Sequence, residues 1–187
     1  MKMWKRIKGF MCSPSETFDA SKEETLGDAY LYFFPLLVFF SVLFAGITGV
    51  ILANPVVQSI LGMSPDFELL TIITLMSASG IILGGTIGVL IIGIWMHIWA
   101  YAFGGRNGLT QTIKALMYAA TPLFVLGWIP VLGTAIGGIW AVLLVLTGLM
   151  QLQEMYSGRS ILALVAALLV PIIIMGAIAA PFILTML

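Results

Sequence analysis

The side chain of this sequence that most plainly invites a chemical role is its single histidine, His97. It lies in the segment Trp95-Met96-His97-Ile98-Trp99-Ala100-Tyr101, near the end of a long apolar stretch. An ionisable side chain at membrane depth is a functional-site hypothesis by default, because a polar group in hydrocarbon is costly. A hydrogen-bonded histidine that serves packing alone fits the same pattern.

A second polar group follows where Pro122 interrupts the next apolar stretch. Proline has no N–H, so it frees the backbone carbonyl of Tyr118, four residues earlier, and Thr121 can satisfy the polar groups nearby. If the membrane region holds a ligand or pore pocket, we expect it to be built from His97, Tyr101, Tyr118 and Thr121, beside Pro122. The alternative is a kink that serves only packing.

The sequence lacks the groups that most membrane chemistry needs. No Asp, Glu, Lys or Arg lies well inside a predicted span, and the nearest acids, Glu68 and Glu154, are at the edges. A proton-coupled carrier normally uses an intramembrane carboxylate, a metal site needs several ligands, and a catalytic Ser or Cys needs a base. We therefore predict that the protein is not an enzyme and has no cofactor, no metal site and no nucleic-acid partner.

The elements that position these residues are predicted from composition. Of 187 residues, 61% are apolar and only 9% are charged, and the mean hydropathy is +1.14. A soluble fold would have too little polar surface, so we predict an all-α integral membrane protein. Five apolar stretches are long enough to be membrane helices, at residues 29–53, 70–103, 115–129, 132–151 and 160–185.

Two of these stretches have unusual lengths. The second has 34 residues, about 51 Å of helix, which exceeds a ~30 Å hydrocarbon core and must tilt, protrude or break. The third and fourth share only 39 residues between Lys114 and Glu154, so they are either two short crossings, which we favour, or a re-entrant hairpin. Gly80, Gly84 and Gly88 form a small-residue face, either for packing within the chain or for a homodimer.

The basic residues predict the orientation. All eight fall before the first stretch or at the second and fourth connections: Lys2, Lys5, Arg6, Lys8, Lys22, Arg106, Lys114 and Arg159. Basic residues of short loops are retained on the cytoplasmic side. We therefore predict a multi-pass protein of the cell membrane with a cytoplasmic N-terminus and, after five crossings, an outer C-terminus.

Residues 1–28 precede the five-helix domain of residues 29–187 and are predicted to form an elbow on the cytoplasmic membrane surface. The first eleven residues place apolar and basic side chains on opposite faces, which is typical of an interfacial amphipathic helix. Ser13-Pro14-Ser15-Glu16 predicts the start of a second short helix that holds Phe18 toward the membrane. We expect anionic lipid headgroups to be held by an anchor made of Lys2, Trp4, Lys5, Arg6 and Lys8.

This pattern resembles the Yip family, the Ypt/Rab-interacting membrane proteins with five spans and a cytoplasmic N-terminus. The similar features are the Pro14 and Phe18 segment, His97 followed by the Gly104-Gly105 turn, Tyr118 with Pro122, and the short third and fourth spans. The resemblance implies a role in membrane organisation, which in eukaryotic relatives means vesicle trafficking through Rab-type GTPases and membrane shaping. The chain lacks the long cytoplasmic N-terminal region of those relatives, and its compact form is similar to prokaryotic members.

We therefore expect a non-enzymatic membrane scaffold or adaptor that organises the membrane or partner proteins. Its partners would be the lipid bilayer, a cytoplasmic protein met from the basic side, and a second copy of the chain. The alternative is a small channel or carrier for an ion or small molecule, with a polar pocket near His97.

Overall fold

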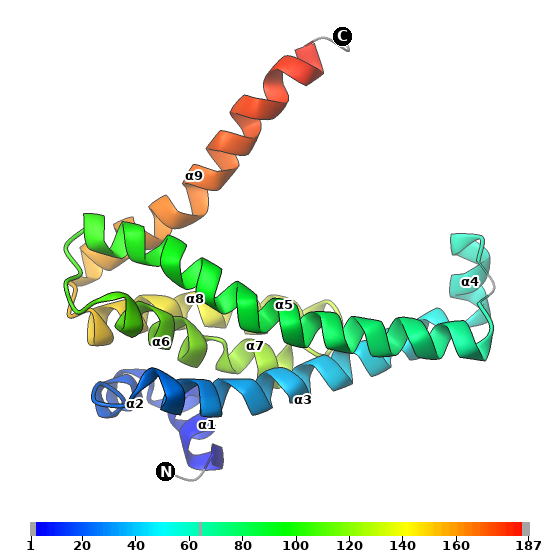
Figure 1. The fold of residues 1–187 in the computed structure, drawn as a ribbon, viewed down its shortest axis with the longest axis horizontal. Helices are drawn as coiled ribbons and strands as arrows, with labels where there is room; N and C mark the ends of the chain where they lie inside the picture. Colours follow the sequence, from blue (N-terminus) through cyan, green and yellow to red (C-terminus); the bar gives the residue numbers. More distant parts are fainter. Residues whose placement is uncertain (1–2, 64, 185–187) are drawn as a thin grey trace.

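The computed structural model describes residues 3–63 and 65–184, and over these residues the chain is built from α-helices (Figure 1). In chain order the helices are α1 Met3–Cys12, α2 Pro14–Ala20, α3 Leu26–Leu52, α4 Pro55–Leu61, α5 Phe67–Ala102, α6 Leu109–Ala119, α7 Thr121–Leu126, α8 Leu132–Leu152 and α9 Ser157–Leu184. The helical segments long and apolar enough to cross a membrane are Leu26–Leu52, Phe67–Ala102, Leu109–Leu126, Leu132–Leu152 and Ser157–Ala179. The predicted all-α membrane fold with five spans is confirmed.

Helices α3 and α5, which share the most extensive helix–helix contact of the described chain, form an antiparallel pair that extends beyond the rest of the bundle (Figure 1). Thr25 and Asp28 cap α3 reciprocally, since each side chain accepts a hydrogen bond from the other residue's backbone N–H. The Asp66 side chain caps α5, which runs unbroken for 36 residues, about 54 Å. The long second span therefore does not break. Its outer part protrudes past the rest of the bundle, with the end of α3 and the short helix of residues 55–61 beside it (Figure 1).

The connection between α3 and α5 contains a short helix, α4, that we did not predict. The side chain of Asn54 accepts a hydrogen bond from the N–H of Val56 at 2.9 Å, and Pro55 occupies the first helical position. Gly62 ends α4 in the left-handed conformation, at φ 65°. The Asn54-Pro55 pair thus follows the end of α3 and starts α4.

The third apolar stretch is divided into α6 and α7 at Ala120, two residues before Pro122. The turn from α7 to α8 is apolar, and polar side chains within it satisfy backbone carbonyls: Thr134 Oγ1 donates to Gly127 O, and Trp128 Nε1 donates to Val125 O, both at 2.8 Å. Such local bonds are needed where water is scarce. The hairpin is therefore compatible with a turn at membrane depth.

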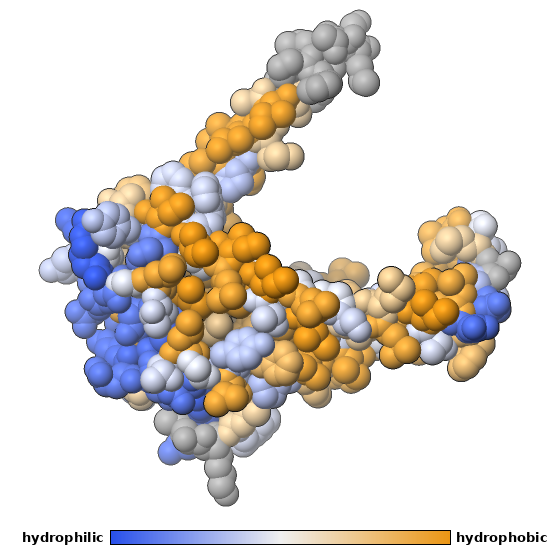
Figure 2. Space-filling view, viewed as in Figure 1, coloured by the Kyte–Doolittle hydropathy of each residue, from blue (hydrophilic) through white to orange (hydrophobic). Residues whose placement is uncertain are grey.

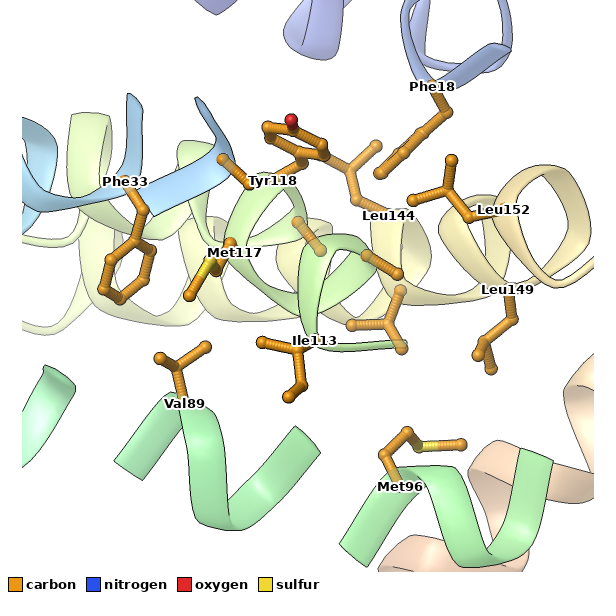
Figure 3. Close-up of a cluster of buried hydrophobic side chains, with 14 of the residues drawn as sticks. Phe18, Phe33, Val89, Met96, Ile113, Met117, Tyr118, Leu144, Leu149 and Leu152 are labelled. Atoms are coloured by element: carbon orange, nitrogen blue, oxygen red, sulfur yellow. The ribbon is translucent and has the colours of Figure 1, made fainter. Parts of the chain in front are cut away.

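The core is built around α6, which lies among α3, α5 and α8 (Figure 3). Seven consecutive or near-consecutive residues of α6 are buried, including Ile113, Met117 and Tyr118. Figure 3 shows Ile113 and Met117 on the side of α6 that faces Val89 and Met96 of α5, and Tyr118 on the other side, near Leu144 of α8. This short span is the least lipid-exposed helix of the bundle, which is why it tolerates more polar residues than the other spans.

The N-terminal elbow, residues 3–24, packs into the bundle. Phe10 of α1 and Phe18 of α2 are both 0% exposed, and Figure 3 shows Phe18 directed from α2 toward α8. The expectation that Phe18 faces the membrane was wrong: the ring of Tyr118 and the glycine at position 148 provide a better-packed apolar site within the protein. The elbow therefore belongs to the same core as the spans.

Hydrophilic residues gather at one end of the molecule (Figure 2). The elbow, the turn at residues 103–108 and the connection at residues 153–156 meet there, as the Lys22 to Glu154 ion pair at 3.5 Å and the hydrogen bonds between Asn107 and the end of α8 show. We call this the charged end.

Candidate functional site at the charged end of the bundle

The elbow is held first by an aromatic cluster formed by Phe10, Phe18, Tyr32 and Tyr118. The Phe10 ring stacks on Tyr118 with centroids 4.8 Å apart and lies 5.0 Å from Phe18 and 5.6 Å from Tyr32. A Cβ added at Gly148 of α8 would lie 2.8 Å from the Ala115 Cβ and 3.2 Å from Cε1 of Phe18. Glycine at this position therefore permits both the α6 to α8 contact and the approach of Phe18.

An ion pair lies over this cluster. Arg6 of α1 donates to Glu24 Oε2 at 2.6 Å, with side chains only 12% and 29% exposed. The Tyr118 hydroxyl donates to the same carboxylate oxygen, and the guanidinium carbon of Arg6 lies 4.7 Å from the Tyr32 ring centroid. A shielded, charge-assisted contact of this kind is stronger than an exposed surface pair. Glu24 lies in the connector between α2 and α3, residues 21–25, and joins it to α1 and to the C-terminal end of α6.

Lys114 of α6 binds the same connector. Its side chain is 0% exposed, and its ammonium group donates to the backbone carbonyls of Lys22 at 2.9 Å and Glu24 at 2.6 Å. Gln111, one turn earlier, also donates to the Lys22 carbonyl. On the outer side, hydrogen bonding to the Asp19 carboxylate raises the pKa of Lys22 above its usual value. Side chains of α6 therefore hold the connector by its backbone carbonyls.

The polar residues beside Pro122 belong to this site. Thr121 Oγ1 donates at 2.6 Å to the carbonyl of Tyr118, which is the carbonyl that Pro122 leaves without a helical donor. This confirms the expected role of Thr121. The Tyr32 hydroxyl hydrogen-bonds Thr121 Oγ1 at 2.9 Å. This bond connects α3 to the break in the third span.

The other predicted pocket residues lie in a second group. His97 Nδ1 hydrogen-bonds Thr112 Oγ1 at 2.9 Å, and Thr112 also accepts from Gln153 at 2.9 Å. Arg106 lies 4.2 Å from the Tyr101 ring centroid and donates to the Tyr101 backbone carbonyl. His97 and Tyr101 thus belong with the turn at residues 103–108, whereas Tyr118, Thr121 and Pro122 belong with the elbow.

Gln153 is the main link in the second group. It is 2% exposed, its amide nitrogen donates to the Gly108 carbonyl at 2.6 Å, and its amide oxygen accepts from the N–H of Asn107 at 3.0 Å. The Asn107 side chain donates in return to the Leu152 carbonyl. The end of α8 is thereby fixed to the turn that follows α5.

The remaining predicted residues lie as follows. Gly80, Gly84 and Gly88 have open space where a Cβ would stand, so nothing in the described chain packs on them within 4 Å. Of the membrane-surface anchor, Trp4 is 75% exposed, and Lys5 and Lys8 are also exposed. Arg6 turns inward to Glu24, and Lys2 lies outside the described residues.

Sequence reasoning missed Glu24 and Gln153, the two residues that join most elements at this end. Glu24 directly precedes the Thr25–Asp28 capping box of α3 but takes no part in it. The available signal was an acid placed directly before an aromatic-rich span and beside basic residues. The partners of Glu24 in α1 and α6 lie too far away in sequence for spacing to reveal them.

Chemically, the polar groups of this site join the elbow to the spans. The half-buried Glu24 carboxylate accepts from the Arg6 guanidinium and the Tyr118 phenol, and the Lys114 ammonium donates to backbone carbonyls; together they hold the elbow on the bundle.

No curated protein and no solved structure matches the chain at a significant level. A family model described as the Yip1 domain matches residues 8–180. This range includes Phe10, Phe18 and Glu24 as well as the spans. Because the match covers nearly the whole sequence, the chain belongs to the Yip1 family of multi-pass membrane proteins.

Proposed function

We propose that the protein is a non-enzymatic membrane scaffold or adaptor that presents its elbow, in a fixed position, to the membrane surface and to a cytoplasmic partner. The observation that carries this proposal is the docking of the elbow. Two fully buried phenylalanines and a shielded ion pair fix α1 and α2 to the spans. A segment that served only as a lipid anchor would need none of these contacts.

The charged end supports a cytoplasmic location for the elbow. The basic residues of the described chain lie in the elbow, in the turn at residues 103–108, in α6 and at the start of α9, and these elements meet at the end where hydrophilic residues gather (Figure 2). By the positive-inside rule, this arrangement supports a cytoplasmic N-terminus and, with an odd number of crossings, an outer C-terminus.

The two elbow helices expose different chemistry. Helix α1 exposes Trp4, Lys5 and Lys8, a combination suited to an interface with anionic headgroups. Helix α2 exposes Glu16 and Asp19, which anionic lipid would repel. We assign α1 to the bilayer surface and α2 to a cytoplasmic protein partner with a basic surface.

A photo-crosslinking amino acid in place of Glu16 tests the proposal in native membranes. We expect defined protein adducts from the otherwise unchanged chain, and their loss in the Phe10→Ala/Phe18→Ala variant, which frees the elbow. The matched control is Phe34→Ala/Phe39→Ala, two phenylalanines of α3 that are 36% and 50% exposed. The control should keep the adducts.

The proposal fails if position 16 yields no protein adduct above background, or if the same adducts persist when the elbow has been freed. In a parallel experiment, hydrogen exchange of α1 in neutral bilayers and in bilayers with anionic lipid tests the lipid assignment. Added protection in anionic lipid supports it, and unchanged protection contradicts it.

The channel or carrier alternative has weaker support. The polar side chains near His97 bond one another and fix the turn at residues 103–108. Flux across liposomes that depends on His97 and Tyr118 would favour this alternative, and flux unchanged by His97→Ala and Tyr118→Ala would count against it.

A further inference from the structure

The outer part of α9 stands away from the rest of the protein (Figure 1). The first part of α9 packs on α5 and α8, with Ser160, Ala163 and Ala167 buried. From Pro171 to Ala179 every side chain is exposed. We call residues 171–179 the arm. Its large apolar side chains are Ile172, Ile173, Ile174, Met175 and Ile178, each between 49% and 67% exposed.

The arm begins at a defined attachment point. Pro171 has no N–H, so the carbonyl of Ala167, four residues earlier, loses its helical donor. Trp95 of α5 replaces that donor, with its Nε1 2.9 Å from the Ala167 oxygen. The helix is thus held to α5 up to this turn, and the arm leaves the bundle immediately beyond it.

An apolar groove lies on α5 and α8, the two helices that the first part of α9 also contacts. Its volume is about 410 Å³, and it lies between α5 and α8 with α6 and α7 as its floor. We call it the α5–α8 groove. Its walls are mostly small or aliphatic and include Gly84, Gly88 and Ile92 of α5 and Gly138, Ala141 and Val142 of α8.

Three of the groove's four glycines are not explained by packing within the described chain, whereas a Cβ at the fourth, Gly85, would lie 2.7 Å from Cδ1 of Leu37. A Cβ added at Gly84, Gly88 or Gly138 would meet no atom within 4 Å. Gly93 of the same α5 is different, since a Cβ there would lie 2.6 Å from Cγ1 of Ile113. Small residues that face open space in a membrane helix allow another helix backbone to approach closely.

We propose that the α5–α8 groove receives the arm of a second copy of this chain. From Gly84 to Ile92 the wall rises about 12 Å along α5, and from residue 171 to residue 179 the arm also rises about 12 Å. Each copy offers one arm and one groove. Two reciprocal insertions therefore form a closed dimer with two-fold symmetry.

The direction of the arm favours a second copy over closure of the chain on itself. To reach its own groove, the arm would have to bend sharply where Trp95 holds α9. A second copy's arm enters as the straight helix already present. The insertion extends the existing contact of α9 with α5 and α8 by one further helix segment.

The test uses disulfide formation between differently tagged chains in native membranes, after Cys12→Ser removes the exposed native cysteine. One chain carries Val142→Cys in the groove and the other carries a single cysteine at residue 172, 174, 175 or 178 of the arm. We expect a mixed dimer at least about tenfold above the control, since a disulfide requires Cα atoms within roughly 7 Å. The yield should vary with helical period along the arm.

The control pairs Ile174→Cys with Val50→Cys, a lipid-facing position on α3 that is 74% exposed. Equal yields from both pairs would overturn the proposal. A disulfide that forms only within one chain carrying both Val142→Cys and Ile174→Cys would show that the arm closes on its own groove. No disulfide in either arrangement would leave the groove to lipid chains. Both results refute the second-copy assignment.

Filling the groove gives an independent measurement. Gly88→Leu and Gly46→Leu each add a side chain in open space on a span, so neither should disturb the fold. Only Gly88→Leu blocks the groove, and it should reduce the mixed dimer severalfold while Gly46→Leu leaves it unchanged. Equal effects would contradict the proposal. The result does not depend on the scaffold role, because the readout does not involve the elbow or its partner.

Discussion

Truncating Phe18 should release the elbow while leaving the spans folded. The Phe18 side chain is 0% exposed and contacts Phe10 and Tyr118, with ring centroids 5.0 Å and 6.1 Å away. Phe→Ala in a packed core costs about 3–5 kcal/mol. Because the helices of the elbow are short and add little stability of their own, this loss falls on the docking equilibrium.

The size of the expected effect follows from that free energy. A loss of about 3–5 kcal/mol raises the fraction of undocked elbow by between roughly 100-fold and a few thousandfold. A freed elbow recovers part of the lost free energy by placing apolar side chains in the bilayer interface, so we expect an increase in the lower part of this range.

Hydrogen exchange of the reconstituted protein measures the change directly. Amides of α1 and α2 should exchange faster by about this factor in Phe18→Ala, because exchange follows local opening. Amides of α5 and α8 should be unchanged. The matched control is Phe39→Ala, the same substitution at a half-exposed position on α3, which should not affect the elbow.

The reasoning would be refuted if α1 and α2 exchanged at the same rate in Phe18→Ala and Phe39→Ala. It would also be refuted if faster exchange extended over the whole chain, because the elbow would then be inseparable from the fold of the spans.

Two further predictions concern Lys114 and Gln153, which hold the connector and the turn at residues 103–108. Lys114→Met removes the ammonium that binds the carbonyls of Lys22 and Glu24 and should destabilise the connector by about 1.5–3 kcal/mol. The control is Lys5→Met, at an exposed position, which should change stability by less than about 0.5 kcal/mol. Thermal unfolding in detergent checks both, and equal midpoints would contradict the role of Lys114. Gln153→Leu keeps the side-chain size but leaves the partners at residues 107 and 108 unbonded, so faster exchange should be confined to the turn at residues 103–108; protection equal to the unchanged chain would argue against the link.

Several local features could be predicted from sequence because they depend on neighbours along the chain. Proline at position 122 identified both the break in the third span and the carbonyl that Thr121 satisfies. The Ser13-Pro14 pair marked the start of α2, although no side-chain cap bond forms there. The predicted spans agree with the helices to within a few residues, except that the third begins six residues earlier, at Leu109.

The site depended on contacts between distant residues, and for that reason it could not be predicted. Glu24 and Tyr118 are 94 positions apart, and Gln153 and Thr112 are 41 apart. The predicted pocket combined His97, an ionisable side chain at membrane depth, with Tyr118, whose carbonyl Pro122 frees. The structure separates them, since α6 presents Thr112 to α5 and Tyr118 to the elbow.

The sequence by itself determined that the chain is a multi-pass helical membrane protein and that its cations fall into the connections of one side. Hydropathy and charge decide these properties, because the bilayer accepts only long apolar helices and each residue contributes independently. Only the tertiary structure decided that the elbow enters the core, that Arg6 turns inward, and that the arm of α9 leaves a groove uncovered. Those outcomes depend on which apolar surfaces fit together, and such fit is a property of packed side chains in three dimensions.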